Sequence, residues 1–164
     1  MKGKRQHLMI DADDTLWQNN IYYELAIDEF IAFLNHSRLT PNEVRAVLDE
    51  IERANVRVHG YGARSFARNL RECYTRLAER HIPEDELDRV MGLGERILRQ
   101  EIELLPGVEE TLRELVDRHD LVLVTKGHPE EQRLKIDRSG VEPYFRRAVI
   151  LAEKDRAAYE RIVA

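Results

Sequence analysis

The sequence predicts an α/β fold in which a parallel sheet is interrupted, after its first strand, by a long helical insertion. Three short apolar runs have the length and composition of buried strands: Leu8–Ile10, Leu121–Val124 and Ala148–Leu151. A helical pattern follows each run, as in a parallel sheet whose strands are joined by helices. Between the first and second runs, about 85 residues (20–104) show only helical patterns.

The first strand is expected over Gln6–Ile10, followed by a polar and aromatic turn that ends near Asn20. Apolar residues at helical spacing then predict a helix from Ile21 to about Leu34. Thr40, Pro41 and Glu43 form a capping-box pattern, so we expect a second helix to begin there and to run toward Ala54.

Glycine and proline residues divide the rest of the chain. The helices expected after the Gly60-Tyr61-Gly62 break cover Ala63–Arg80, Pro83–Glu101, Gly107–Asp117, Pro129–Ser139 and a closing stretch to Ala164. Residues 1–17 and 105–164 are therefore expected to form an α/β core domain, and residues 18–104 a separate helical domain.

Composition narrows the class of protein. The 164 residues include 43% hydrophobic and 35% charged side chains, typical of a globular protein, and the net charge of −5 disfavours nucleic acid as a partner. No run approaches the roughly 20 apolar residues of a membrane span, and no signal-length apolar segment follows Met1–Lys4. Cys73 is the single cysteine. We expect a cytoplasmic protein.

Polar signatures follow all three predicted strands. Asp11 and Asp13 come after the first strand, Thr125 ends the second, and Lys154 follows the third. Because ligands bind outside the carboxyl ends of strands in an open parallel sheet, these side chains are expected to share one edge. Carboxylates clustered after a buried strand need compensation, and a cation or a phosphoryl group would supply it.

Each of these residues also has a purely structural interpretation. Aspartate and threonine terminate strands and cap helices, which is how we interpret Asp14. Thr125 alone would be an ordinary strand residue, and Lys154 alone a solvated charge beside Glu153 or Asp155. His7 and His128 lack metal-ligand spacing. Only the joint occurrence of the signatures favours a site.

In this order and strand context the signatures resemble the haloacid dehalogenase superfamily, whose phosphatases carry D-x-D-x-T, then Ser or Thr, then Lys. Here the first motif reads Asp11-Ala12-Asp13-Asp14-Thr15. The resemblance covers residues 6–160 and implies a Rossmann-like three-layer core with a parallel sheet. It also implies that residues 18–104 form a helical-bundle cap, because one subclass of the family carries its cap at this place.

The resemblance assigns chemical roles to the motif residues. Asp11 would be the nucleophile that forms an aspartyl-phosphate, and Asp13 would protonate the leaving alcohol and then activate water. A halide leaving group needs no proton, and the family's dehalogenases lack an acid at this position. Asp13 therefore favours phosphoryl transfer over dehalogenation.

The other residues would bind the phosphoryl group and a metal. Thr125 would donate a hydrogen bond to a phosphoryl oxygen and Lys154 would offset charge, each worth on the order of 3 kcal/mol in the barrier. The backbone amides of Ala12 and Lys126 are implied to complete the phosphate cradle. Mg²⁺ is the implied cofactor, held by Asp11 and Asp13, the latter through its backbone carbonyl.

One part of the family pattern is not found in the sequence. The family continues after the lysine into a further strand whose acids complete the metal site, whereas this sequence ends at Ala164. We therefore expect weak metal binding, with Glu153, Asp155 or a second chain as less favoured substitutes. The first strand would become an exposed edge, so we also expect a homodimer or segment exchange.

The leading interpretation is a Mg²⁺-dependent phosphatase of a small phosphorylated metabolite. The alternatives are a truncated, catalytically weak relative that acts through dimerisation or ligand binding, and, least favoured, a phospho-accepting signalling receiver. The substrate is not indicated. Polar and aromatic residues near predicted turns are candidates for specificity, although a structural role suits most of them better: Trp17, Asn19, Asn20, Arg57, His59, Tyr61 and Arg64.

Overall fold

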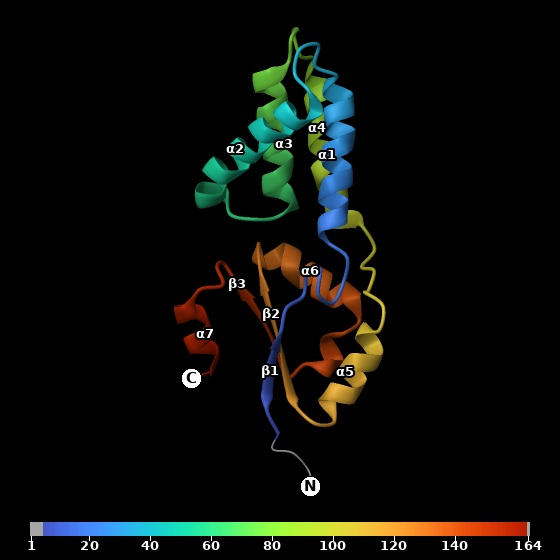
Figure 1. The fold of residues 1–164 in the computed structure, drawn as a ribbon, viewed down its shortest axis with the longest axis vertical. Helices are drawn as coiled ribbons and strands as arrows, with labels where there is room; N and C mark the ends of the chain where they lie inside the picture. Colours follow the sequence, from blue (N-terminus) through green and yellow to red (C-terminus); the bar gives the residue numbers. More distant parts are fainter. Residues whose placement is uncertain (1–4, 164) are drawn as a thin grey trace. The chain divides into compact units, whose positions relative to one another are not determined.

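The computed structural model describes residues 5–163 and divides the chain into two compact units (Figure 1). One unit, here called the sheet unit, combines the residues up to Asn20 with those from Glu101 onward. The other, the helical unit, is Ile21–Gln100. The expected N-terminal tail, Met1–Lys4, and the last residue of the closing helix, Ala164, lie outside the described residues.

The sheet unit contains a three-stranded parallel sheet in the order β1-β2-β3. Its strands are β1 (His7–Ile10), β2 (Asp120–Lys126) and β3 (Arg147–Leu151). In the register, Ile10 pairs with Leu123, and Thr125 pairs with Ile150. All three strands therefore end at one edge, as the sequence predicted.

Alternation along β2 gives the sheet two buried faces. Leu121 and Leu123 belong to the core beneath α5 (Val108–Val116) and α6 (Pro129–Ser139). Val122 and Val124 face the opposite side, where they cluster with Ile162 of α7 (Arg156–Val163). Helices thus cover both faces, which Figure 1 shows. The predicted Rossmann-like α/β fold with a parallel sheet is confirmed.

The helical unit packs its helices around a core of its own. Its elements are α1 (Asn20–Leu34), α2 (Pro41–His59), α3 (Ala63–Leu77), α4 (Glu84–Glu95) and the short 3₁₀ helix η1 (Arg96–Arg99). Phe30, Leu48, Leu70 and Val90 are fully buried in its centre. Apolar residues at helical spacing therefore mark its core, as the sequence analysis expected.

Three helix ends differ by three residues or more from the sequence prediction. The third helix, expected to reach Arg80, ends at Leu77. The capping box of Thr40 and Glu43 forms as predicted, but α2 runs beyond Ala54 to His59. Gly60 follows with a φ of 68° and ends the helix. The fourth helix, expected to reach Glu101, ends at Glu95 and tightens into η1. Gly92 and Gly94 near that end weaken the α-helical preference there.

The two segments that join the units pair with each other. Gln18 N–H donates to the Glu103 carbonyl at 2.9 Å, and Leu105 N–H donates to the Leu16 carbonyl at 2.9 Å. Between them, Trp17 forms an isolated antiparallel bridge with Leu104. The chain therefore leaves the sheet unit and returns to it along adjacent backbone segments.

Within residues 5–163, β1 has a strand neighbour only on its β2 side. The homodimer expected through its other edge stays a prediction. In the same part of the chain, no helix combines the length and the apolar character that a membrane span requires.

Candidate active site

A tight turn at the end of β1 presents the first carboxylates. Thr15 N–H and Leu16 N–H both donate to the Ala12 carbonyl, at 3.1 and 2.7 Å, and Asp14 adopts a φ of 56°. This conformation is uncommon for a residue with a side chain. The Asp14 carboxylate accepts the Asn19 and Asn20 amides at 2.9 and 3.0 Å, so Asp14 caps the start of α1.

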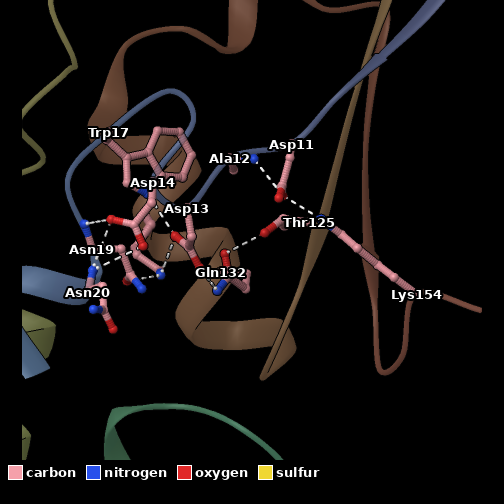
Figure 2. A network of polar contacts seen from close by, with 11 residues as sticks. Asp11, Ala12, Asp13, Asp14, Trp17, Asn19, Asn20, Thr125, Gln132 and Lys154 are labelled. Atoms are coloured by element: carbon pink, nitrogen blue, oxygen red, sulfur yellow. Dashed lines mark hydrogen bonds and ion pairs between the residues drawn. The ribbon is translucent and has the colours of Figure 1, made fainter.

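Asp11 is paired with Lys154, as Figure 2 shows. Lys154 Nζ lies 2.5 Å from Asp11 Oδ1, and the same oxygen accepts the Ala12 amide at 2.7 Å. Among the described residues, no donor reaches Oδ2, and the Asp11 side chain is 47% exposed. One oxygen of Asp11 is therefore anchored, while the other faces solvent with its lone pairs available.

Asp13 is held more firmly than Asp11. Its Oδ1 accepts the Trp17 indole N–H at 2.8 Å and lies 2.6 Å from Lys135 Nζ. Its Oδ2 accepts the Gln132 amide at 2.9 Å. The Asp13 side chain is 22% exposed, so solvent still reaches it. The two carboxylates of the motif are therefore in different surroundings.

Thr125 is buried at the end of β2, where its hydroxyl donates to Gln132 Oε1 at 3.1 Å. Continuing the β1–β2 register places Thr125 beside Ala12. Figure 2 shows the Thr125 hydroxyl on the same side of the sheet edge as Asp11, Asp13 and Lys154. The four predicted catalytic residues therefore gather at the carboxyl ends of the three strands.

The charged residues after β3 have separate partners. Glu153 lies 3.6 Å from the Lys126 ammonium, and Asp155 accepts the Ala158 amide at the start of α7 at 2.7 Å. Neither contacts Lys154, whose ammonium is with Asp11 instead. Lys154 is therefore not a solvated charge between its neighbours. The Lys126 side chain lies beside Glu153, and the role expected for its backbone amide in a phosphate cradle stays a prediction.

Gln132 and Lys135 were not predicted as site residues from the sequence. Both contact Asp13, and they stand three residues apart on α6, hence on one helix face. A pair of polar residues at this spacing, on the helix that follows Thr125, is the feature of the sequence that could have indicated them as site residues. Trp17 was only a specificity candidate, but it is fully buried and bonds Asp13.

The donor set suits a small hard cation only in part. The exposed carboxylate of Asp11 and the backbone carbonyl of Asp13 are oxygen ligands of the kind that Mg²⁺ prefers, and Mg²⁺ keeps several waters. The carboxylate of Asp13 already accepts three donors, which leaves fewer of its lone pairs for a metal. Among residues 5–163, no group of three or more histidine, cysteine, aspartate or glutamate side chains is arranged for a metal.

The site places two aspartates, Asp11 and Asp13, directly after the first strand of an α/β fold. The sequence profile of the haloacid dehalogenase-like hydrolases matches residues 6–162. The chain belongs to this family. A search of curated protein sequences gave no match.

Solved structures of the family share the fold. A haloacid dehalogenase-like family hydrolase from Xanthomonas campestris is 31% identical, with a TM-score of 0.88 over 97% of this chain. The chain spans 66% of that protein's length, just under two thirds. A 2-haloacid dehalogenase from Pseudomonas syringae is 20% identical, with a TM-score of 0.61 over 97% of this chain and 71% of its own. A predicted phosphoglycolate phosphatase from Haemophilus somnus is 20% identical, with a TM-score of 0.54 over 96% of this chain and 69% of its own.

Proposed function

We propose that this chain is a phosphatase that hydrolyses a small phosphorylated metabolite through an aspartyl-phosphate on Asp11. One observation carries the proposal: Asp13, the second carboxylate, is held in place by Trp17, Gln132 and Lys135. An alcohol leaving group needs a placed proton donor, whereas a halide needs none. The environment of Asp13 therefore supports phosphoryl transfer better than dehalogenation, the reaction named for the Pseudomonas relative.

In the first step, Asp11 Oδ2 attacks phosphorus, the bond from phosphorus to the alcohol oxygen breaks, and Asp13 gives its proton to that oxygen. Lys154 contacts Oδ1 of Asp11, so it does not block the attacking oxygen Oδ2. The ammonium also stands where it offsets the negative charge that gathers between Asp11 and the transferring group.

In the second step, Asp13 takes a proton from a water that attacks phosphorus, and the bond between phosphorus and Asp11 breaks to release phosphate. Thr125 has a single hydroxyl proton, which it donates to Gln132 in this structure. To bind a phosphoryl oxygen, the hydroxyl rotates away from Gln132. Substrate binding is thus proposed to exchange one hydrogen bond of Thr125 for another.

Mg²⁺ is the proposed cofactor, with Asp11 and the Asp13 carbonyl as its protein ligands. When bound, it would offset the charge of the phosphoryl oxygens. We further propose that the helical unit serves as the cap of the enzyme and determines which phosphorylated metabolite is accepted, as expected for an insertion at this place in the family.

The test is hydrolysis of 4-nitrophenyl phosphate with added Mg²⁺ by the wild-type protein and by Asp11→Asn. We expect turnover that falls roughly 10³-fold or more in the variant, because the nucleophile is lost. Asp137→Asn is the matched control, because it removes an exposed carboxylate that pairs with Arg133 on α6. It is expected to keep wild-type turnover.

The competing outcomes are distinct. Halide release from a 2-haloacid, with no phosphate release, would establish a dehalogenase instead. Absence of any turnover that depends on Asp11 would support the alternative of a catalytically weak relative that acts through association or ligand binding.

A further inference from the structure

We propose that Lys135 is a positioning residue that holds the carboxylate of Asp13 for proton transfer and connects it to the segment that enters α1. The inference rests on the proposed phosphatase function and adds a residue to its site. Lys135 reaches Asp13 from α6, at a separation of 122 residues along the chain.

The contacts of Asp13 fix both the place and the plane of its carboxylate. Oδ1 is held by Trp17 from one chain segment and by Lys135 from another, while Oδ2 is held by Gln132. A carboxylate with donors on both oxygens cannot rotate about its terminal bond without losing contacts. Oδ2 has one protein donor rather than two, so it retains more capacity to exchange a proton with substrate or water.

The supporting residues stand on a rigid element. Gln132 is 5% exposed, and Ile136 on the same helix is completely buried in the core beneath the sheet. The Lys135 side chain is 20% exposed, so its ion pair with Asp13 is partly shielded from water. A charge-assisted contact in such a place is stronger and more directional than a fully exposed ion pair.

Lys135 also contacts Asn19. Its ammonium lies 2.9 Å from Asn19 Oδ1, and the Asn19 amide donates to Asp14 at 2.9 Å. Figure 2 shows the contact between Asn19 and Asp14 beside Asp13. One ammonium group therefore joins the proposed acid–base residue to the backbone that leads from the sheet unit into α1.

A change at Lys135 is expected to lower kcat/KM most for the substrate whose leaving group depends most on a proton from Asp13. The ratio kcat/KM reports the steps up to departure of the leaving group, in which Asp13 supplies a proton. Phenolate leaves less readily than 4-nitrophenolate, so phenyl phosphate depends more on that proton. The two esters have similar shapes, which makes binding differences small.

The experiment compares Lys135→Met and Lys135→Arg with the wild type on phenyl phosphate and 4-nitrophenyl phosphate. For Lys135→Met, we expect kcat/KM to fall roughly 10- to 100-fold on phenyl phosphate, part of the full effect of acid catalysis, and only about 3-fold on 4-nitrophenyl phosphate. Lys135→Arg keeps the charge and is expected to restore part of the loss on phenyl phosphate.

Arg133→Met is the matched control, because Arg133 is a cation on the same helix whose partners are Asp137 and Glu142. It is expected to leave both kcat/KM values unchanged. Thermal unfolding shows whether each variant is folded. If Lys135→Met does not fold, Lys135→Gln, which keeps a hydrogen-bond donor, takes its place with the same expected selectivity.

Equal losses on the two esters would overturn the inference, because a purely structural defect has no reason to depend on the leaving group. So would wild-type kinetics for the neutral variant. Both results are distinguishable from failure of the proposed function, in which the wild-type protein itself shows no turnover that depends on Asp11.

Discussion

Asp11 and Asp13 are each paired with a lysine from a different part of the chain. Asp11 is 2.5 Å from Lys154, and Asp13 is 2.6 Å from Lys135. Two carboxylates separated by one residue repel each other, and two ammonium groups offset that repulsion at short range. Their other contacts differ, since the indole and amide donors go to Asp13. These surroundings support the proposal that Asp11 attacks phosphorus and that Asp13 transfers the proton.

Gly127 tests the importance of the Gln132 contact. Its φ is 146°, and a Cβ at this position would lie 2.9 Å from Gln132 Nε2. We expect Gly127→Ala to displace the amide from Asp13 and to lower kcat/KM on phenyl phosphate about 10-fold, a fraction of the general acid effect. The unfavourable backbone conformation is expected to cost a further 1–3 kcal/mol, roughly, in stability.

The control for this substitution is Gly140→Ala at the end of α6. Gly140 has a φ of 72°, and nothing lies within 4 Å of a Cβ there. It is expected to lose stability in urea unfolding without loss of kcat/KM. If both alanine variants were equally impaired as catalysts, backbone strain rather than the Gln132 contact would explain the effect.

At the scale of elements, α3 and α4 approach closely at one glycine. A Cβ on Gly94 would lie 2.8 Å from Ala67 Cα and 2.9 Å from its backbone nitrogen. Backbone atoms cannot move aside as a flexible side chain can. Gly94 therefore permits the contact between these two helices, and it does so within the helical unit.

We expect Gly94→Ala to lower the free energy of unfolding by roughly 1–3 kcal/mol, the usual cost of overpacking. Gly92→Ala, on the same helix with nothing within 4 Å of the added Cβ, is expected to raise it by up to about 1 kcal/mol through helix propensity. Urea unfolding measures both. If both substitutions raised the free energy of unfolding, helix propensity and not the contact between α3 and α4 would determine the effect of Gly94→Ala.

Elements with strong local patterns were predictable from the sequence. The limits of α6 and the capping box of α2 agree with prediction, because they depend on residues a few positions apart. The end of α4 was missed, since apolar spacing continues through η1 while the backbone tightens.

The site residues were likewise predictable where neighbouring residues in the sequence determine their position, and not where packing does. Asp11, Asp13 and Lys154 follow strands and Thr125 lies near the end of one, so all four could be assigned to one sheet edge. Gln132 contacts Asp13 across 119 residues of chain, and only the packing of α6 determines this contact.

At the scale of the whole molecule, acid is expected to destabilise both units. Hydrogen bonds or ion pairs lower the pKa of four carboxyl groups, each by a partner nearby: Glu43 by the Thr40 backbone, Glu79 by the Ser37 hydroxyl, Glu86 by Arg80 and Asp120 by Arg5. Burial raises the pKa of Glu52, an opposite effect.

A carboxyl group whose pKa is lower in the folded state stabilises that state above its unfolded pKa and ceases to do so as pH falls through the folded pKa. We therefore expect the urea midpoint to fall as pH drops below about 4.3, the ordinary glutamate pKa. Urea unfolding at pH 7, 5 and 3 measures it. Glu52→Gln is expected to raise the midpoint at pH 7, because it removes a buried charge. An unchanged midpoint between pH 5 and pH 3 would contradict the assignment.

The paired segments at Trp17 and Leu104 have a consequence for how such a chain can diversify. Because Gln18 and Glu103 are joined by a hydrogen bond, everything between them begins and ends at one place on the sheet unit. Insertions whose ends lie together are exchanged with little disturbance to the host fold. A different helical bundle, or a short turn, can thus replace the helical unit at this junction. The sheet unit, with the pairs Asp11–Lys154 and Asp13–Lys135, would stay the same.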